Sequence, residues 1–177
     1  ETAAMHLGWN ISHGAVVQAL LRLWRDASSG LVPRLVHLLR AEGTETAEQW
    51  AERLEECQRT VREAMASWDR WTERAFDLMR RHGSQEEGGS ITLRIRPDVP
   101  PEGWDEAANE GANAAALLSD LLRPLERLLP VLKDEGGDLA LQAAITDLNG
   151  AVKSLSEARN AIRSFLAMDR PEFVYWL

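Results

Sequence analysis

The sequence predicts a mostly α-helical domain, an antiparallel and arch-like bundle of long helices with a minor two-stranded β element. Between Thr46 and His82 the chain contains neither Gly nor Pro, and its apolar residues recur at alternating spacings of three and four. Such spacing is typical of a heptad seam. A second seam with the same spacing covers residues 138–168, and a short alternating segment lies between them near residues 90–96. We therefore expect one domain over residues 1–177, in which the two seams pack side by side.

Residues 1–45 predict two short leading helices. Ser12 is a candidate N-cap, and apolar residues follow it at helical spacing as far as Arg25. The Ala-Ser-Ser-Gly stretch at 27–30 then breaks the pattern. Pro33 suits the beginning of a second helix, and Gly43 suits its end.

The body of the domain, residues 46–169, predicts long helices and one strand. Residues 83–89 have the composition of a loop, and the alternation from Ile91 to Ile95 indicates a half-buried strand. Helical character resumes near Trp104, in an element that Pro124 and Pro130 should kink or divide. Asp138 is a candidate cap for the second seam. Gly150 lies within that seam, where we expect it to mark a close approach of two helices.

Residues 171–177 predict a return strand. After Pro171 the chain from Phe173 to Leu177 is aromatic and β-branched, a composition that favours strands. We expect this segment to pair with the strand at Ile91–Ile95, although about eighty positions separate the two in the sequence.

Charge and cysteine content restrict the possible functions. The chain has 20 basic and 28 acidic residues, for a net charge of −8, which repels phosphate backbones at long range. Cys57 is its one cysteine, so neither an internal disulfide nor a cysteine-clustered metal site can form. No apolar run has the length of a membrane span, and there is no signal-peptide pattern. These features predict a cytoplasmic chain without a membrane partner.

No complete catalytic, cofactor-binding or metal-binding site is predicted. The glycines at 83, 88 and 89 lack the Lys-Ser or Lys-Thr of a phosphate-binding loop. The pairs Glu55-Glu56 and Glu86-Glu87 have the pattern of solvated carboxylates rather than of an acid and a base. Cys57 falls on the apolar seam, as a buried small residue does. Structural or surface roles are predicted for the four histidines, which are His6, His13, His37 and His82.

Aromatic and basic residues supply the candidate binding surface. Trp50, Trp68 and Trp71 lie at seam positions, where core packing is favoured over stacking on a nucleobase. Arg94 and Arg96 share the outward face of the predicted strand. They are candidate phosphate contacts, and the alternative is an ordinary solvated strand face.

Three segments resemble the DinG-type, XPD-like superfamily-two DNA helicases of bacteria. They are HLGWNISHGAVVQALLRLW at 6–24, GLVPRL at 30–35 and FVYWL at 173–177. In that family similar segments flank a helical insertion, the arch, between the Asp-Glu-Ala-His box and the next helicase motif. Residues 174–177 resemble its return strand, cut before a Glu. The resemblance covers the two ends of the chain, and the middle agrees in length and helical character.

The resemblance implies an accessory arch domain of an ATP-dependent 5′-to-3′ DNA helicase with a role in DNA repair. Its partners would be the motor domains of the same polypeptide and single-stranded DNA. ATP and Mg would be held by the parent protein outside residues 1–177, and the resemblance also allows an iron–sulfur cluster there. The alternative from the residues themselves is a stand-alone helical interaction module that pairs through an exposed heptad seam. A small helical enzyme is disfavoured because no set of residues supplies its roles.

Overall fold

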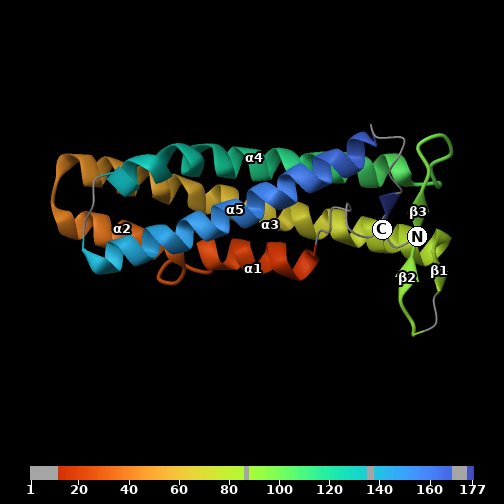
Figure 1. The fold of residues 1–177 in the computed structure, drawn as a ribbon, viewed down its shortest axis with the longest axis horizontal. Coiled ribbons are helices and arrows are strands. Elements are labelled where there is room, and N and C mark those ends of the chain that lie inside the picture. Colours follow the sequence, from red (N-terminus) through yellow and green to blue (C-terminus); the bar gives the residue numbers. More distant parts are fainter. Residues whose placement is uncertain (1–11, 86–87, 135–137, 169–174) are drawn as a thin grey trace.

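A computed structural model describes residues 12–85, 88–134, 138–168 and 175–177 (Figure 1). Its helices are His13–Leu23 (α1), Leu31–Glu42 (α2), Glu45–His82 (α3), Trp104–Asp134 (α4) and Leu139–Ala167 (α5). Its strands are Ser84–Gln85 (β1), Ile91–Thr92 (β2), Arg94–Ile95 (β3) and Tyr175–Trp176 (β4). The predicted fold class, a mostly α bundle of long helices with minor β structure, is confirmed.

Side-chain caps and a left-handed glycine set the helix ends. The Ser12 hydroxyl accepts the N–H of Ala15 at 3.4 Å, and a carboxylate oxygen of Asp138 accepts the N–H of Leu141 at 2.7 Å. Gly43 ends α2 with φ 68°, a conformation that a glycine adopts without steric cost. These three predicted boundaries are confirmed. Pro33 lies in the first turn of α2, two residues after the helix begins at Leu31.

The helices form four parallel columns, one of which is built from two pieces (Figure 1). The short helices α1 and α2 follow one another along the first column, and α3, α4 and α5 form the others, each antiparallel to its neighbour. α3 packs against α2 and α4, whereas α5 packs against α4, α1 and α2. The expectation that residues 46–82 and 138–168 pack side by side is therefore wrong. Their seams face the same core from diagonal columns, with α4 between them on one side.

The apolar seam of α3 is buried inside the chain's own bundle. Its buried residues are Leu54, Cys57, Val61, Ala64, Trp68, Trp71, Ala75 and Leu78. The predicted core role is confirmed for Trp68 and Trp71, and Trp50 is half-buried against the same core. Because the seam is covered, it offers no exposed surface to a partner helix. The alternative of an interaction module that pairs through this seam gains no support from the structure.

The prolines do not divide α4, which runs unbroken from Trp104 to Asp134. Pro124 and Pro130 both lie on its exposed side, where water can hydrate the carbonyls of Asp120 and Glu126 that the prolines leave without an N–H partner. The opposite side of the helix carries a row of buried leucines. Their burial outweighs the cost of about 3 kcal/mol for a proline in a helix interior.

The β structure differs from the prediction because the strand at 91–95 changes partners in its middle. β1, which lies inside the stretch predicted as a loop, pairs with β2, and β3 pairs with β4. Both pairs are antiparallel. Gly83 allows the first pairing, since a Cβ there would lie 2.7 Å from Ile91 Cγ2. The predicted pairing with the return strand is confirmed for residues 94–95 with 175–176, and residues 171–174 lie outside the described part of the chain.

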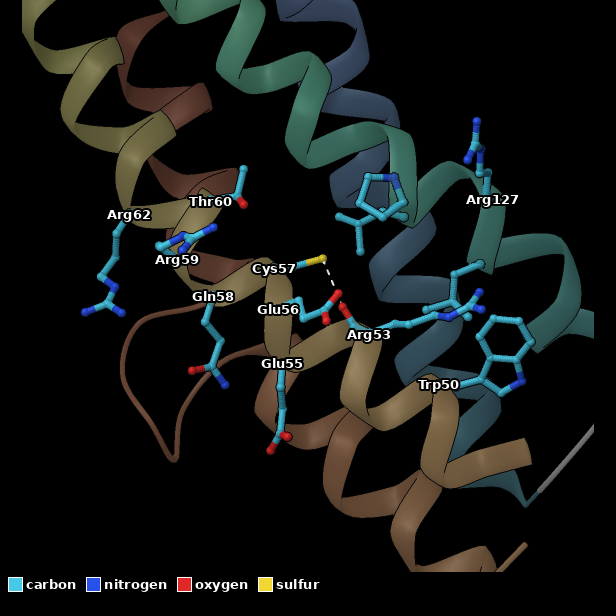
Figure 2. A pocket seen from close by; sticks show the side chains of 13 residues that line it. Trp50, Arg53, Glu55, Glu56, Cys57, Gln58, Arg59, Thr60, Arg62 and Arg127 are labelled. Carbon is cyan, nitrogen blue, oxygen red and sulfur yellow. Dashed lines mark hydrogen bonds between the residues drawn. The ribbon is translucent and has the colours of Figure 1, made fainter. Parts of the chain in front are cut away.

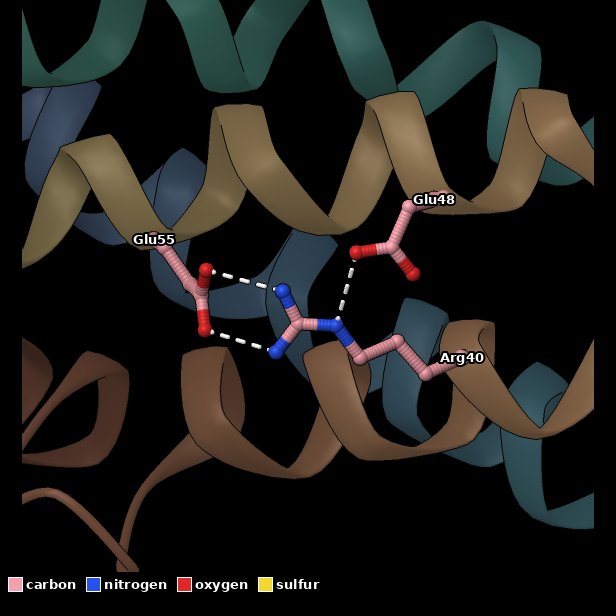
Figure 3. A network of polar contacts seen from close by, with 3 residues as sticks. All are labelled: Arg40, Glu48 and Glu55. Atoms are coloured by element: carbon pink, nitrogen blue, oxygen red, sulfur yellow. Dashed lines mark hydrogen bonds and ion pairs between the residues drawn. The ribbon is translucent and has the colours of Figure 1, made fainter.

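An arginine joins the second and third helices (Figure 3). Both terminal nitrogens of the Arg40 guanidinium bind the Glu55 carboxylate, at 2.8 and 3.0 Å, while its Nε donates to Glu48 at 3.0 Å. These bonds, chiefly the pair to Glu55, raise the pKa of Arg40 above its ordinary value. The contact is exposed, so we assign it to the orientation of α2 on α3 rather than to a large part of the stability.

Two glycines within helices have opposite surroundings and give a matched prediction. A Cβ on buried Gly111 would lie 2.8 Å from Trp71 Nε1 and 3.1 Å from Leu166 Cδ1, whereas nothing lies within 4 Å of one on exposed Gly150. The prediction of a close helix approach at Gly150 is therefore wrong, and the close approach is at Gly111. We expect Gly111→Ala to destabilise the protein by about 1–2 kcal/mol through overpacking, and Gly150→Ala to stabilise it by about 0.5–1 kcal/mol. Urea unfolding of both variants measures this, and equal stabilisation by both would contradict it.

Candidate nucleic-acid interface

The sheet of β3 and β4 lies at the end of the bundle and is held there by a second, smaller core. Ile95 and Tyr175 point inward from the two strands and are buried. They pack with Trp104 at the beginning of α4 and with Phe165 near the end of α5. The Phe165 ring meets those of Trp104 and Tyr175 edge to face, at centroid distances of 5.7 and 6.2 Å. Two helices, α4 and α5, thus fix the orientation of this sheet.

Arg94 and Arg96 point to solvent from the other face of this sheet, as the alternation predicts. Both are exposed, whereas Ile95 between them and Leu93 before them are buried. Among the described residues, no carboxylate forms an ion pair with either guanidinium. Two exposed guanidinium groups, one on β3 and one on the residue that follows it, have the chemistry to bind phosphate oxygens.

Trp176 belongs to the same face and is the residue that sequence reasoning missed. It is the cross-strand partner of Arg94 and is 56% exposed. Residues directly opposite in an antiparallel pair project to the same side of the sheet. The signal was present in the alternation of the return strand, because an inward Tyr175 requires an outward Trp176. Only the pairing register shows which of the two faces the core.

A groove of about 810 Å³ between α3 and α4 is the second candidate binding site (Figure 2). Arg53 lies over the Trp50 ring at 4.8 Å on one side, and Cys57 lies between the two helices. The groove mixes cations with the carboxylates of Glu55 and Glu56, and its side chains diverge toward solvent in Figure 2. This arrangement converges on no single ligand chemistry, so we assign no function to the groove.

The other residues that the sequence singled out, where described, make contacts within the fold or lie on its surface. Glu55 binds Arg40 and Glu56 lines the groove, whereas Glu86-Glu87 and His6 lie outside the described residues. Trp68 Nε1 donates to Nδ1 of His13 at 3.2 Å, and Nε2 of His82 donates to the carbonyl of Glu102 at 3.1 Å. His37 is exposed on α2. The described histidines are thus dispersed over the fold.

The described part of the chain shows neither a metal cluster nor a membrane-spanning helix, and the chain matches no known relative. Within residues 12–85, 88–134, 138–168 and 175–177, no three His, Cys, Asp or Glu side chains gather as metal ligands would. In the same ranges no helix has an apolar stretch long enough to cross a membrane. No protein-family model, characterised protein or solved structure matches the chain. Fold and site define its class as a four-column helical bundle with a small β-sheet at one end.

Proposed function

We propose that this chain is an accessory arch-type domain of an ATP-dependent 5′-to-3′ DNA helicase. In this proposal the domain helps to enclose or guide single-stranded DNA and catalyses no reaction itself. Its partners are the motor domains of the same polypeptide, which bind ATP and Mg. The resemblance of the segments at 6–24, 30–35 and 173–177 is the sequence basis for the proposal, and it also favours a cytoplasmic bacterial protein of DNA repair.

The direction of the helices supports an insertion that leaves a neighbouring body and returns to it. α1 runs away from the end of the bundle that carries the β3–β4 sheet, and α5 runs toward that end (Figure 1). The last described residues, 175–177, then join the sheet there. A segment inserted in another domain needs its two connections on one side, and the opposite directions of α1 and α5 support such an arrangement.

The observation that carries the DNA-contact part of the proposal is the cationic face of the β3–β4 sheet. Arg94 and Arg96 lie at the end of the bundle to which the chain returns, where a strand held by the neighbouring motor would pass. The net charge of −8 opposes DNA over the rest of the surface. We therefore infer a local and salt-sensitive contact, while the rigid bundle acts mainly by steric enclosure.

The gene tests the arch assignment directly. The proposal expects a phosphate-binding loop and an Asp-Glu-Ala-His box encoded upstream of residue 1, and a second motor domain downstream of residue 177. Sequencing of the flanking reading frame measures this. A reading frame that contains neither would contradict the proposal and favour a stand-alone interaction module.

Charge reversal tests the DNA contact. We expect Arg94→Glu with Arg96→Glu to weaken binding of a labelled oligo(dT) by at least about tenfold at low salt, because two phosphate contacts are replaced by repulsion. The salt dependence should also fall, by about 0.7 in the slope of log K against log salt for each lost contact. Fluorescence anisotropy across a salt series gives both quantities.

A matched pair elsewhere on the surface separates the contact from a general charge effect. Arg34→Glu with Arg123→Glu alters the net charge by the same amount on exposed helix positions, so it should leave binding nearly unchanged. Equal losses in both double variants would show that Arg94 and Arg96 form no site. Nanomolar binding by the wild-type chain at physiological salt would contradict the mainly steric role.

A further inference from the structure

The indole of Trp176 is exposed to solvent. Its side chain is 56% exposed, although its neighbour Tyr175 is buried in the small core behind the sheet. The rings of Trp24, Trp50 and Phe76 are each covered by an arginine guanidinium at about 5 Å, from Arg62, Arg53 and Arg80. No such cation lies over Trp176 among the described residues.

Backbone register places this indole beside the two arginines. Leu93 and Leu177 exchange both backbone hydrogen bonds, at 3.1 and 2.9 Å. Arg94 and Trp176, the next pair along, therefore form a non-hydrogen-bonded pair, in which the side chains lie closest together. Arg96 lies two residues further on, just past the end of β3, and is exposed. Among the described residues, the indole of Trp176 thus lies beside the guanidinium-bearing Arg94.

We propose that Trp176 is a stacking platform for an unpaired base, and that Arg94 and Arg96 hold the adjoining phosphates. The inference rests on the proposed function and adds to it the side chain that binds a base. An exposed indole can stack on any base, but only where the base is not already stacked within a duplex. The face therefore selects single-stranded over double-stranded DNA without reading its sequence.

The surroundings of the indole favour a nucleic acid over a protein partner. A protein interface would surround an exposed tryptophan with further apolar contact area. Among the described residues, the cross-strand neighbour is Arg94, and the exposed Arg96 lies two positions further along the chain. A ligand that combines a planar π surface with regularly spaced anions satisfies both features at once.

The test compares three labelled ligands of equal length: oligo(dT), an abasic strand with the same phosphates, and a duplex. We expect the wild-type chain to bind oligo(dT) about tenfold more tightly than the abasic strand, which corresponds to the stacking of about one base. Trp176→Ala should bind both strands equally, and Trp176→Phe should keep part of the preference. Leu139→Ala, an exposed apolar residue at the opposite end of the bundle, should behave as wild type. Anisotropy titrations at low salt measure all of these affinities.

The outcomes separate this inference from the proposed function. If oligo(dT) and the abasic strand bind equally well to the wild-type chain, stacking is wrong while the phosphate contact stands. A preference that survives in Trp176→Ala would also reject the platform. If no strand binds at low salt, both the DNA contact and the inference built on it fail. Circular dichroism of each variant confirms that the fold is kept.

Discussion

Replacement of Trp68 by alanine is expected to destabilise the protein by about 3–5 kcal/mol, the usual cost of removing a large buried aromatic side chain. Trp68 is fully buried in the main core. Its ring meets that of Trp71 edge to face at a centroid distance of 4.9 Å, and its indole N–H donates to His13 at 3.2 Å. The substitution therefore removes apolar contacts, an aromatic pair and the contact that joins α1 to α3. Urea unfolding followed by circular dichroism measures the loss.

The same substitution at an exposed tryptophan is the control. Trp176→Ala removes the same atoms from the surface, so it should cost less than about 1 kcal/mol. A comparable loss at both positions would mean that Trp68 contributes no more through burial than a surface residue does.

The hydrogen bond can be measured separately in a double-mutant cycle. His13→Ala leaves the indole N–H of Trp68 without its acceptor, and Trp68→Phe removes the donor. We expect a coupling energy of about 1 kcal/mol between the two positions, the usual net value of one hydrogen bond. A coupling near zero would show that the contact between α1 and α3 depends on packing alone.

The helices could be predicted from sequence because their signals are local. The seam from Trp50 to Leu78 repeats without interruption, and Ser12, Gly43 and Asp138 mark boundaries through their own side chains or backbone freedom. The packing partners could not be predicted in this way. The apolar face of either long seam could pack against the apolar face of any other helix. The column formed by α1 and α2 contacts both α3 and α5, and this places α3 and α5 diagonally across the bundle.

Close contacts explain the other differences between sequence and structure. A glycine in a helix reads the same whether its missing Cβ makes room for Trp71, as at Gly111, or faces solvent, as at Gly150. The pairing of Ser84–Gln85 likewise depends on the space that Gly83 leaves for Ile91, which no local pattern records.

The candidate site could be predicted in part. The alternation around Ile95 placed Arg94 and Arg96 on one outward face, since the period of a strand is fixed. Trp176 could not be added without the register, because both faces of the return strand carry aromatic or apolar residues. Which aromatic rings a guanidinium covers is likewise a property of the folded chain, as the contacts of Arg53, Arg62 and Arg80 show.

The thiol of Cys57 is expected to react with iodoacetamide at pH 8 at least about a hundredfold more slowly than an exposed thiol. Burial, and secondly the negative charge of Glu56, raise the pKa of Cys57 from 9.0 to about 11. At pH 8 such a thiol holds about a hundredfold less of the reactive thiolate than one with the ordinary pKa. Its Sγ also donates to the Arg53 carbonyl at 3.5 Å. Mass spectrometry of time points in native buffer and in urea compares the two rates.

Two glutamate variants test which cause dominates. Glu56→Gln removes the charge that contributes second, so the reaction should accelerate only modestly, because burial remains. Glu52→Gln, one turn earlier on the same helix and exposed, should leave the rate unchanged. A rate in native buffer equal to that in urea would contradict the buried position of the thiol in the seam.

The raised pKa of Cys57 also fixes the sign of a pH effect on stability. Below pH 9.0 the thiol is protonated in both the folded and the unfolded chain, so its contribution is present in full. Between pH 9 and 11 the unfolded chain loses this proton first, and the free energy of unfolding falls as the pH rises. Cys57→Ala lacks the titrating group, so the stability difference between wild type and variant should narrow over this range and remain constant below it. A difference that widened would mean that the fold stabilises the thiolate, the opposite of what burial of the thiol does.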